Sequence, residues 1–282
     1  MQFYYFGGNF YDGNTTMLED SYFDGVMFVY DSTLGDVFTK IVKDMKPNEK
    51  IKYLVAIRPY TISPQYLCMI NKSMNSIMPS RLQINFISGY VKEHEKYFGG
   101  ILGNINDESN NIDRSNYLID YIKTLNSMPG NKEDFELDFY VSTTNEYVFN
   151  ATEEYDNKII LPYRDYKNGY WTEVDNLYGN TTGNKFDYSK RKVMLAITPI
   201  IRRTQEELDR SEEYAKRPNW KEGERGGTVT DIEYFTYEEF DKFIVDLEKK
   251  GIHGILMNGH LQEERENLIG FIKQYRELKL TT

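Results

Sequence analysis

Few side chains in this sequence have the types and spacing that acid–base, nucleophilic or metal chemistry requires. The three histidines, His94, His253 and His260, are scattered and have no carboxylates at matching spacing, which argues against a zinc site. His260 follows a strand-like apolar run and could act as a general acid or base, whereas His253 is expected at the surface or at a helix end. The single cysteine, Cys68, excludes an intrachain disulfide and a cysteine-rich metal site, and its apolar, helical surroundings favour a buried thiol.

Residues that suit an anionic ligand are easier to find. Thr143 and Thr144 stand at the start of a helical segment, where free backbone N–H groups and the helix dipole favour a phosphate and the hydroxyls add donors. The alternative is that one of the two is only the N-cap of that helix. Arg225, in a polar loop beside Glu224, carries a guanidinium that suits sulfonate or phosphate, unless it is simply solvated. Arg58 precedes a proline at a strand end, and a structural ion pair explains it better than a place in a site.

The elements that must position these residues alternate between short apolar runs and longer amphipathic segments. Several runs are β-branched and unbroken, as expected of parallel strands that are covered on both faces. The eight runs are Phe3–Phe6, Val26–Tyr30, Tyr53–Ile57, Leu82–Ile87, Leu137–Val141, Ile159–Leu161, Val193–Ile201 and Ile255–Met257. Eight such strands with helices between them predict a single (β/α)₈ TIM barrel over residues 1–282, with its site at the carboxyl ends of the strands.

Helical periodicity fills most of the connections. In Asp36–Met45, for example, Val37, Ile41, Val42 and Met45 fall on one face. The other helical segments are Gln65–Met78, Asn116–Leu125, Asn145–Glu154, Tyr237–Lys250 and Glu263–Leu278. Each of these segments separates two of the apolar runs, or follows the last one, as the barrel requires.

Three connections depart from this regular pattern. The link from Gly7 to Gly25 is too short for a helix of usual length, so the first helix is predicted to be trimmed. Asp165–Arg191 and Arg217–Asp231 are polar, glycine-bearing stretches that predict long loops after the sixth and seventh strands, where a mobile loop can act as a lid. An open doubly wound sheet is the alternative architecture, but its glycine-rich phosphate turn is missing after the first strand.

Composition narrows the classes of partner. The 282 residues are 40% hydrophobic and 28% charged, with a net charge of −10 and no basic cluster, so nucleic acid and anionic membranes are poor candidates as partners. No stretch approaches the roughly 18 apolar residues of a membrane span, and the first residues lack the features of a secretory signal. These observations lead us to expect a soluble, cytoplasmic protein.

Several stretches of the chain, in order, resemble the bacterial-luciferase-like flavin monooxygenases, and the alkanesulfonate monooxygenases in particular. The resemblance covers most of the chain with gaps, and the order of the pieces is more specific than any one of them. The pieces are FDGV at 23–26, LVAIRP at 54–59, SP at 63–64, RLQINFISG at 81–89, YVSTT at 140–144, ERGGT at 224–228 and GIHGILMNGHLQEE at 251–264.

The resemblance implies an enzyme that takes reduced FMN as a diffusible co-substrate from a flavin reductase and uses it with O₂ on a small organic substrate that can be anionic. The flavin carries the difficult chemistry, while the protein binds, orients and excludes water. Relatives often dimerise through barrel helices, so a homodimer is also expected. The residues that match the family's positions are Ser88, Tyr117, Thr143 and Thr144 for flavin binding, and Arg225 and His260 for catalysis.

Four positions depart from the family's pattern. Ala196 and Thr198 stand where the family has Arg and His, Leu34 stands where the alkanesulfonate enzymes have Cys, and Asp113 replaces a His one turn before Tyr117. Each lost catalytic group can be worth about 10²–10⁴ in rate, so sulfonate chemistry cannot run here in the same way.

Three functions follow from these observations as hypotheses. The first is an FMN-dependent monooxygenase with a changed substrate, and the second is a luciferase-like barrel without catalysis that acts as a binding or partner subunit. The third is a barrel hydrolase or isomerase with another cofactor or none, since fold alone does not decide function. Carboxylates for this third reading are available without a convincing pairing, at Asp12, Asp24, Asp31 and Glu224.

Overall fold

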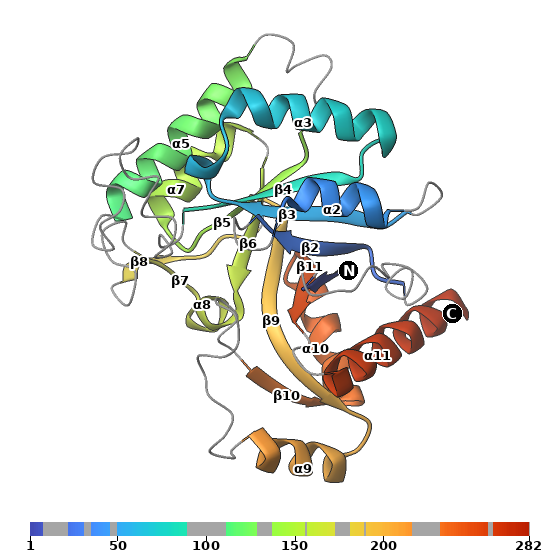
Figure 1. Cartoon of the computed structure of the whole chain (residues 1–282). Coiled ribbons are helices and arrows are strands. Elements are labelled where there is room, and N and C mark those ends of the chain that lie inside the picture. Colours follow the sequence, from blue (N-terminus) through green and yellow to red (C-terminus); the bar gives the residue numbers. More distant parts are fainter. Residues whose placement is uncertain are drawn as a thin grey trace.

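The computed structural model has the predicted closed barrel of parallel strands surrounded by helices (Figure 1). It describes residues 1–7, 22–30, 35–45, 50–88, 111–128, 137–155, 157–172, 181–188, 190–215, 232–258 and 262–281. The strands of the ring are β1 (Gln2–Phe6), β2 (Gly25–Val29), β3 (Lys52–Ile57), β4 (Leu82–Ile87), β5 (Phe139–Ser142), β6 (Lys158–Pro162), β9 (Val193–Arg202) and β11 (Ile252–Asn258). Each of the eight predicted apolar runs is one of these strands.

Strand β9 closes the ring and also extends beyond it. Its first half pairs with β11 on one side and with β6 on the other, which completes the circle of parallel strands. Its second half, from Thr198 to Arg202, pairs instead with β10 (Ile232–Thr236), a parallel strand outside the ring. One long apolar run therefore serves two purposes, barrel closure and the support of an additional strand.

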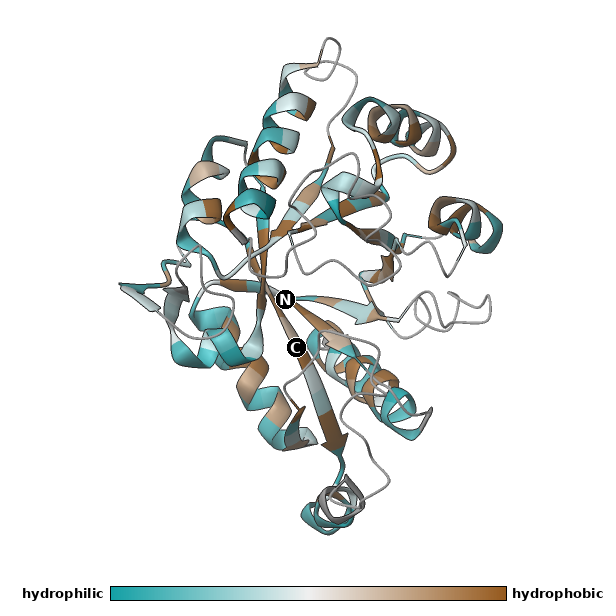
Figure 2. Ribbon diagram, turned by 60° about the vertical axis from the view of Figure 1, so that its left-hand side comes forward, coloured by the Kyte–Doolittle hydropathy of each residue, from teal (hydrophilic) through white to brown (hydrophobic). Residues whose placement is uncertain are grey.

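Helices cover the outside of the barrel. They are α2 (Val37–Asp44), α3 (Pro64–Ile77), α5 (Asn111–Ser127), α7 (Glu146–Ala151), α8 (Tyr163–Asn168), α9 (Gln205–Ala215), α10 (Tyr237–Lys249) and α11 (Gln262–Thr281), with short 3₁₀ turns η2 (Pro59–Thr61) and η5 (Glu153–Tyr155). The six predicted helical segments correspond to α2, α3, α5, α7 with η5, α10 and α11. In Figure 2 the apolar strands occupy the centre and the helices around them show both apolar and polar residues, as amphipathic helices should.

The strands are apolar on both faces because two separate clusters bury them. An outer cluster fills the space between strands and helices and includes Phe3, Val55 and Ile84. An inner cluster fills the barrel itself, and its buried members are Tyr4, Phe6, Met27, Leu54, Ala56, Tyr140, Ile160, Met194 and Leu256. Alternation along each strand sends successive side chains to the two clusters, which explains the unbroken apolar runs.

A polar network crosses the amino-terminal end of the barrel interior. Tyr4 donates from its hydroxyl to Oε1 of Gln83 at 2.6 Å, and Gln83 in turn donates to the carboxylate of Asp138. Lys158 also donates to Asp138, and Lys52 lies 3.9 Å from the same carboxylate. Burial by itself would raise the pKa of Asp138, but the hydrogen bonds from Lys158 and Gln83 outweigh it and hold that pKa below its usual value. The network links β1, β3, β4 and β6 to the residue that precedes β5.

His253 is part of this barrel interior, and the expectation of a surface or helix-end histidine was wrong. It lies within β11, its ring stacks on that of Tyr140 with centroids 6.3 Å apart, and its Nδ1 is 3.0 Å from the carbonyl oxygen of Val193. Burial lowers its pKa, and the nearby Lys158 lowers it further. The imidazole therefore acts here as a packing group. The predicted eighth strand began only at Ile255, so His253 fell outside it, whereas β11 begins at Ile252.

The stretch predicted as a long loop after the sixth strand contains regular structure. It holds α8 and an antiparallel hairpin of β7 (Tyr170–Thr172) and β8 (Thr181–Lys185). Trp171 anchors the hairpin, with its ring 4.3 Å from that of Phe149 and 4.4 Å from that of Phe186. The sequence did not predict the hairpin because β8 is short, polar and mostly exposed. The second predicted loop, Arg217–Asp231, and most of the predicted trimmed first connection lie outside the described residues.

Candidate active site at the carboxyl end of the barrel

The carboxyl ends of the ring strands meet at one end of the barrel, where sites of this architecture are built. Eight interior positions near these ends continue the alternation of the inner cluster and carry uncharged side chains. They are Phe6, Val29, Ala56, Asn85, Ser142, Ala196, Thr198 and Asn258. The buried Arg58, one residue after β3, continues the alternation of Leu54 and Ala56 and is the charged exception. Apart from Arg58, this end of the interior suits an uncharged, partly polar ligand surface.

Two of these residues form a polar pair on neighbouring strands. Ser142, at the end of β5, donates from its hydroxyl to Oδ1 of Asn85 on β4 at 3.0 Å. Asn85 is only 1% exposed. The sequence contained a signal for this pair, because Gln83 and Asn85 occupy alternate positions of an otherwise apolar strand and so must share the interior face.

Thr198 and Asn258 lie on adjacent strands across the ring from that pair. The residues that precede them, Ile197 and Met257, are partners in the β9–β11 register. Both side chains are buried, and Thr198 is 3% exposed. Within the described part of the chain, the hydroxyl of Thr198 has no hydrogen-bond partner. Sequence reasoning treated Thr198 only as a lost histidine and missed the buried hydroxyl that replaces it.

Two arginines stand at strand ends on this side of the barrel. Arg58 follows β3 and is buried, and its carbonyl accepts hydrogen bonds from the N–H and the hydroxyl of Thr61, which shapes the turn before α3. Arg202 ends β9, donates to the carbonyl of Ile201 at 2.9 Å and pairs with Glu263 at 3.2 Å. The Arg202 ion pair ties the extended strand β9 to the first turn of α11 and was not predicted.

The junction of β5 and α7 tests part of the prediction for Thr143 and Thr144. The two interpretations were phosphate-binding hydroxyls and a helix N-cap. Asn145 is the N-cap of α7, since its Oδ1 accepts from the N–H of Tyr147 at 2.9 Å. The hydroxyl of Thr143 is buried and accepts from the N–H of Asn145 at 3.0 Å, so it shapes the turn. Thr144 is half-buried between them. Neither threonine is the cap of α7.

The other predicted flavin-binding residues lie on neighbouring elements. Tyr117 is half-buried on α5, with its ring 6.5 Å from that of Tyr121, and burial raises the pKa of its phenol, which keeps it a proton donor. Helix α5 contacts α7, where Tyr147 donates to Asn116 at 2.8 Å. Ser88 is half-buried directly after β4. A common role of these residues in binding one flavin stays a prediction.

Several predicted residues cannot be placed. Arg225 and His260, the predicted catalytic residues, and Leu34 lie outside the described residues. Within the described ranges, no group of three or more His, Cys, Asp or Glu side chains is arranged to hold a metal ion. Among the helices described, none combines the length and apolarity needed to cross a bilayer.

Comparison with known proteins identifies the fold through structure alone. No family model and no curated protein sequence matches the chain. Among solved structures, the EDTA monooxygenase of Chelativorans sp. BNC1 superimposes with a TM-score of 0.66 at 9% identity, covering 99% of this chain and 94% of that one. An F420-dependent secondary alcohol dehydrogenase gives 0.64 at 13% identity, covering 97% of both chains. The oxygenating constituent of 3,6-diketocamphane monooxygenase from Pseudomonas putida, solved with FMN, gives 0.58 at 11% identity, covering 96% of this chain and 94% of that one.

This chain has the luciferase-like barrel fold. The likeness extends over nearly the whole length of each luciferase-like neighbour, so the match is to the entire barrel and not to a shared fragment. At these identities the likeness shows the fold only.

Proposed function

We propose that this protein is a flavin-dependent oxidoreductase of the monooxygenase type, which uses reduced FMN and O₂ on a small organic substrate. The observation that carries the proposal is a partly polar interior, uncharged apart from Arg58, at the carboxyl end of a luciferase-like barrel. Its structural neighbours supply further support, because they include two monooxygenases, one of them solved with FMN, and an F420-dependent dehydrogenase. We place the protein in the cytoplasm, with a flavin reductase as the source of reduced FMN.

The residues at the barrel end fit the two parts of FMN. The flavin ring is planar and mostly uncharged, which matches the Asn85–Ser142 pair and the small side chain of Ala196. The phosphate would lie at the start of α7, held by Thr144 and the phenol of Tyr117. When bound, the flavin would supply the redox and oxygen chemistry. The chain itself would orient the ring and keep water away from it.

The substrate proposal follows from the charges at the barrel end. The two described arginines at these strand ends are both engaged, since Arg202 pairs with Glu263 and the buried Arg58 also has an interaction partner. Interior positions Ala196 and Thr198 on the same strand are uncharged. A substrate with a negative group would therefore depend on Arg225, whereas a neutral substrate would not need it. We therefore propose that the loop that carries Arg225 determines whether the enzyme accepts a negatively charged substrate.

Titration with flavins tests the proposal directly. Wild-type protein should bind FMN more tightly than riboflavin, which lacks the phosphate. Thr144→Ala should weaken FMN binding about 10-fold, because a hydrogen bond to a charged group is lost, and should leave riboflavin binding unchanged. Quenching of flavin fluorescence measures both affinities. Thr124→Ala, at an exposed position of α5, is the matched control and should bind both flavins as the wild type does.

The outcome also separates the proposed enzyme from a binding subunit. The uncharged side chains of Ala196 and Thr198 on β9 favour the second candidate function, a barrel that has kept the fold and given up catalysis. Absence of binding by oxidised and reduced FMN would contradict the flavin proposal. Binding of FMN without any O₂ consumption above that of a flavin reductase alone would support the subunit.

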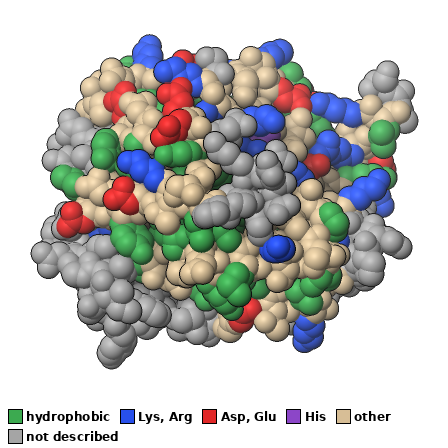
Figure 3. All heavy atoms as spheres, turned by 90° about the horizontal axis from the view of Figure 1, so that it is seen from above, with side chains coloured by type: hydrophobic (Ala, Val, Ile, Leu, Met, Phe, Trp, Pro, Cys, Tyr) green, Lys and Arg blue, Asp and Glu red, His purple; other side chains and the backbone are tan. Residues whose placement is uncertain are grey.

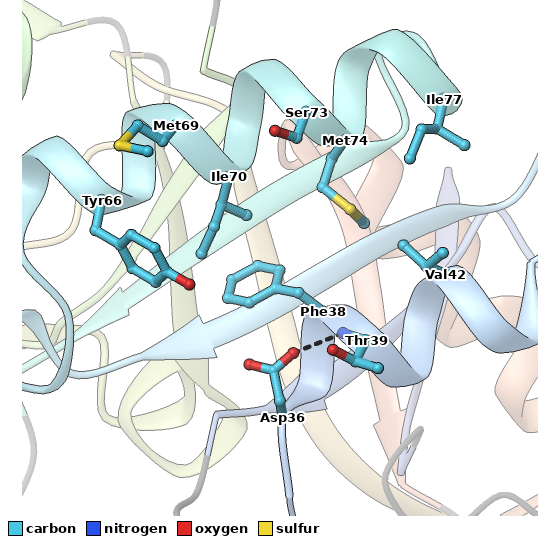
Figure 4. A pocket seen from close by; sticks show the side chains of 10 residues that line it. All are labelled: Asp36, Phe38, Thr39, Val42, Tyr66, Met69, Ile70, Ser73, Met74 and Ile77. Carbon is cyan, nitrogen blue, oxygen red and sulfur yellow. Dashed lines mark hydrogen bonds between the residues drawn. The ribbon is translucent and has the colours of Figure 1, made fainter.

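We also propose that two copies of the chain associate through α2 and α3. These helices flank a groove of about 450 Å³ that is lined mainly by apolar side chains (Figure 4). Met69 is 59% exposed there, Tyr66 54% and Ile77 50%. The only charged residue of α3 is Lys72, whereas the face of the molecule in Figure 3 as a whole carries both acidic and basic side chains. Large apolar side chains with few charges are typical of the centre of a protein–protein interface.

Introducing a charge on this groove should separate the two copies. Met69→Lys is expected to convert a dimer into a monomer, because the ammonium would lose its water in the interface. Light scattering coupled to size-exclusion chromatography gives the mass in each case. Leu280→Lys, at a position 76% exposed on α11, is the control and should remain dimeric. A wild-type protein with the mass of one chain would contradict the dimer.

A further inference from the structure

The hydroxyl of Thr198 is a buried polar group that the described fold does not use. The residue is 3% exposed, and its Oγ1 has no hydrogen-bond partner among the described residues. Its neighbours along the same face of β9 are Ala196 and Ile200, and its partner in register on β10 is Ile232. These three neighbours offer no polar side-chain atom, and Asn258, next to Thr198 in the β9–β11 register, does not hydrogen-bond the hydroxyl. The hydroxyl therefore stays unpaired at the candidate site.

A valine would fit this position at lower cost to the fold. Valine and threonine share a β-branched shape, but a buried hydroxyl without a partner loses its hydrogen bonds to water and gains none. Residues inside a barrel normally avoid this loss, because buried polar side chains are almost always paired. A threonine at position 198 is therefore explained better by something that binds there than by the packing of the barrel.

We propose that the Thr198 hydroxyl hydrogen-bonds an uncharged oxygen or nitrogen of the flavin ring. This inference rests on the proposed function and assigns a ring-binding residue to it. The ring suits the position better than the phosphate does, because Thr144 follows β5 and Thr198 belongs to β9, with β6 between those two strands. The side chains around the barrel end, Asn85, Ser142 and Asn258, are likewise uncharged. Thr198 stands where the resembled family has a histidine. Its hydroxyl can hydrogen-bond but, unlike an imidazole, does not become protonated and charged.

Thermal unfolding without ligand tests whether the Thr198 hydroxyl is unpaired in the free protein. Thr198→Val should raise Tm by about 2–4 °C, because it removes an unpaired buried hydroxyl at constant shape. Thr152→Val is the matched control with the opposite sign. Thr152 is fully buried, and its hydroxyl donates to Val148 at 2.9 Å and accepts from Arg191 at 3.1 Å. The Thr152→Val variant should lower Tm.

Titrations with riboflavin and FMN test whether the Thr198 hydroxyl binds the flavin ring. Thr198→Val should weaken the binding of both flavins about 2- to 10-fold, since both carry the ring and one neutral hydrogen bond is lost. Thr198→Ser keeps the hydroxyl and should stay within about twofold of the wild type. A merely structural threonine would not give higher stability together with weaker binding.

The outcomes separate this inference from the proposed function. If the wild type binds flavin and Thr198→Val either lowers Tm or binds both flavins unchanged, the assignment of Thr198 is overturned and the flavin proposal stands. If the wild type binds neither FMN nor riboflavin, the proposed function fails and the assignment fails with it. A gain in Tm with a loss of affinity for both flavins supports the assignment.

Discussion

Gly25→Ala is expected to cost about 3 kcal/mol or more of folding free energy, a large share of the roughly 5–15 kcal/mol by which a typical domain is stable. Gly25 begins β2, and a Cβ atom there would lie 2.2 Å from Cε1 and 2.5 Å from Cδ1 of the Tyr4 ring. The ring cannot move aside, because Tyr4 is fully buried in the barrel and its hydroxyl is held by Gln83. Urea unfolding followed by far-UV circular dichroism measures the loss.

Gly254→Ala is the matched control for this prediction. It also lies on a barrel strand, but its added Cβ would meet the end of the flexible Met194 side chain at 3.3 Å, so a loss below about 1 kcal/mol is expected. Combining Gly25→Ala with Tyr4→Leu removes the ring that the new methyl group meets. The double variant should therefore lose less than the sum of its two single losses. Equal losses of stability for the two glycine variants would show that the Tyr4 ring does not exclude a side chain at position 25.

Arg191→Met is expected to lose about 2–4 kcal/mol of stability. The guanidinium is buried, donates to Oγ1 of Thr152 and Oδ1 of Asn157 at 3.1 Å each and to the carbonyl of Phe149, and lies over the Phe149 ring. Burial lowers its pKa to about 10, so it is still charged at neutral pH. Methionine fills the space but leaves these acceptors at the end of α7 without a donor. Denaturant titration at pH 7 checks the value.

The same substitution has a consequence for flavin binding. Arg191 fixes the carboxyl end of α7, and the amino end of that helix follows the Thr143–Asn145 turn. If the turn binds the phosphate, Arg191→Met should weaken FMN more than riboflavin. Arg210→Met removes an exposed arginine that pairs with Glu206, and it should change stability by less than about 0.5 kcal/mol. A loss as large as that of Arg191→Met in this control would contradict the assigned role.

The strands of this barrel were predictable from sequence, because apolar runs buried on both faces leave a strong local pattern. The pattern could not show that Val193–Arg202 changes partners halfway, since pairing with β10 depends on a strand from a distant part of the chain. The exposed, polar β8 left no apolar signal at all. Local patterns therefore predicted the ring, and the additions to it depended on contacts that a sequence window does not contain.

The candidate site was predictable to a smaller extent. The sequence placed Thr143 and Thr144 before a helix, but the cap proved to be Asn145, a residue type that equally favours that position. Asn85 could have been found, as a polar residue alternating with apolar ones. Thr198 could not, because its burial and its unpaired hydroxyl depend on closure of the ring and on pairing with β10. Residues matched to a family remain hypotheses until the fold shows what surrounds them.

The double pairing of β9 has a consequence for how this barrel can evolve. The segment 216–231, which includes Arg225, leaves from α9 and ends at β10, and both of these elements contact the outer half of β9. Its two attachment points thus share one strand, while closure of the circle depends on the inner half of that strand. A change in the length of this connection leaves both of its anchors on the same strand, apart from the half of β9 that closes the ring. The connection can therefore vary in length between related chains while its two anchors stay in place.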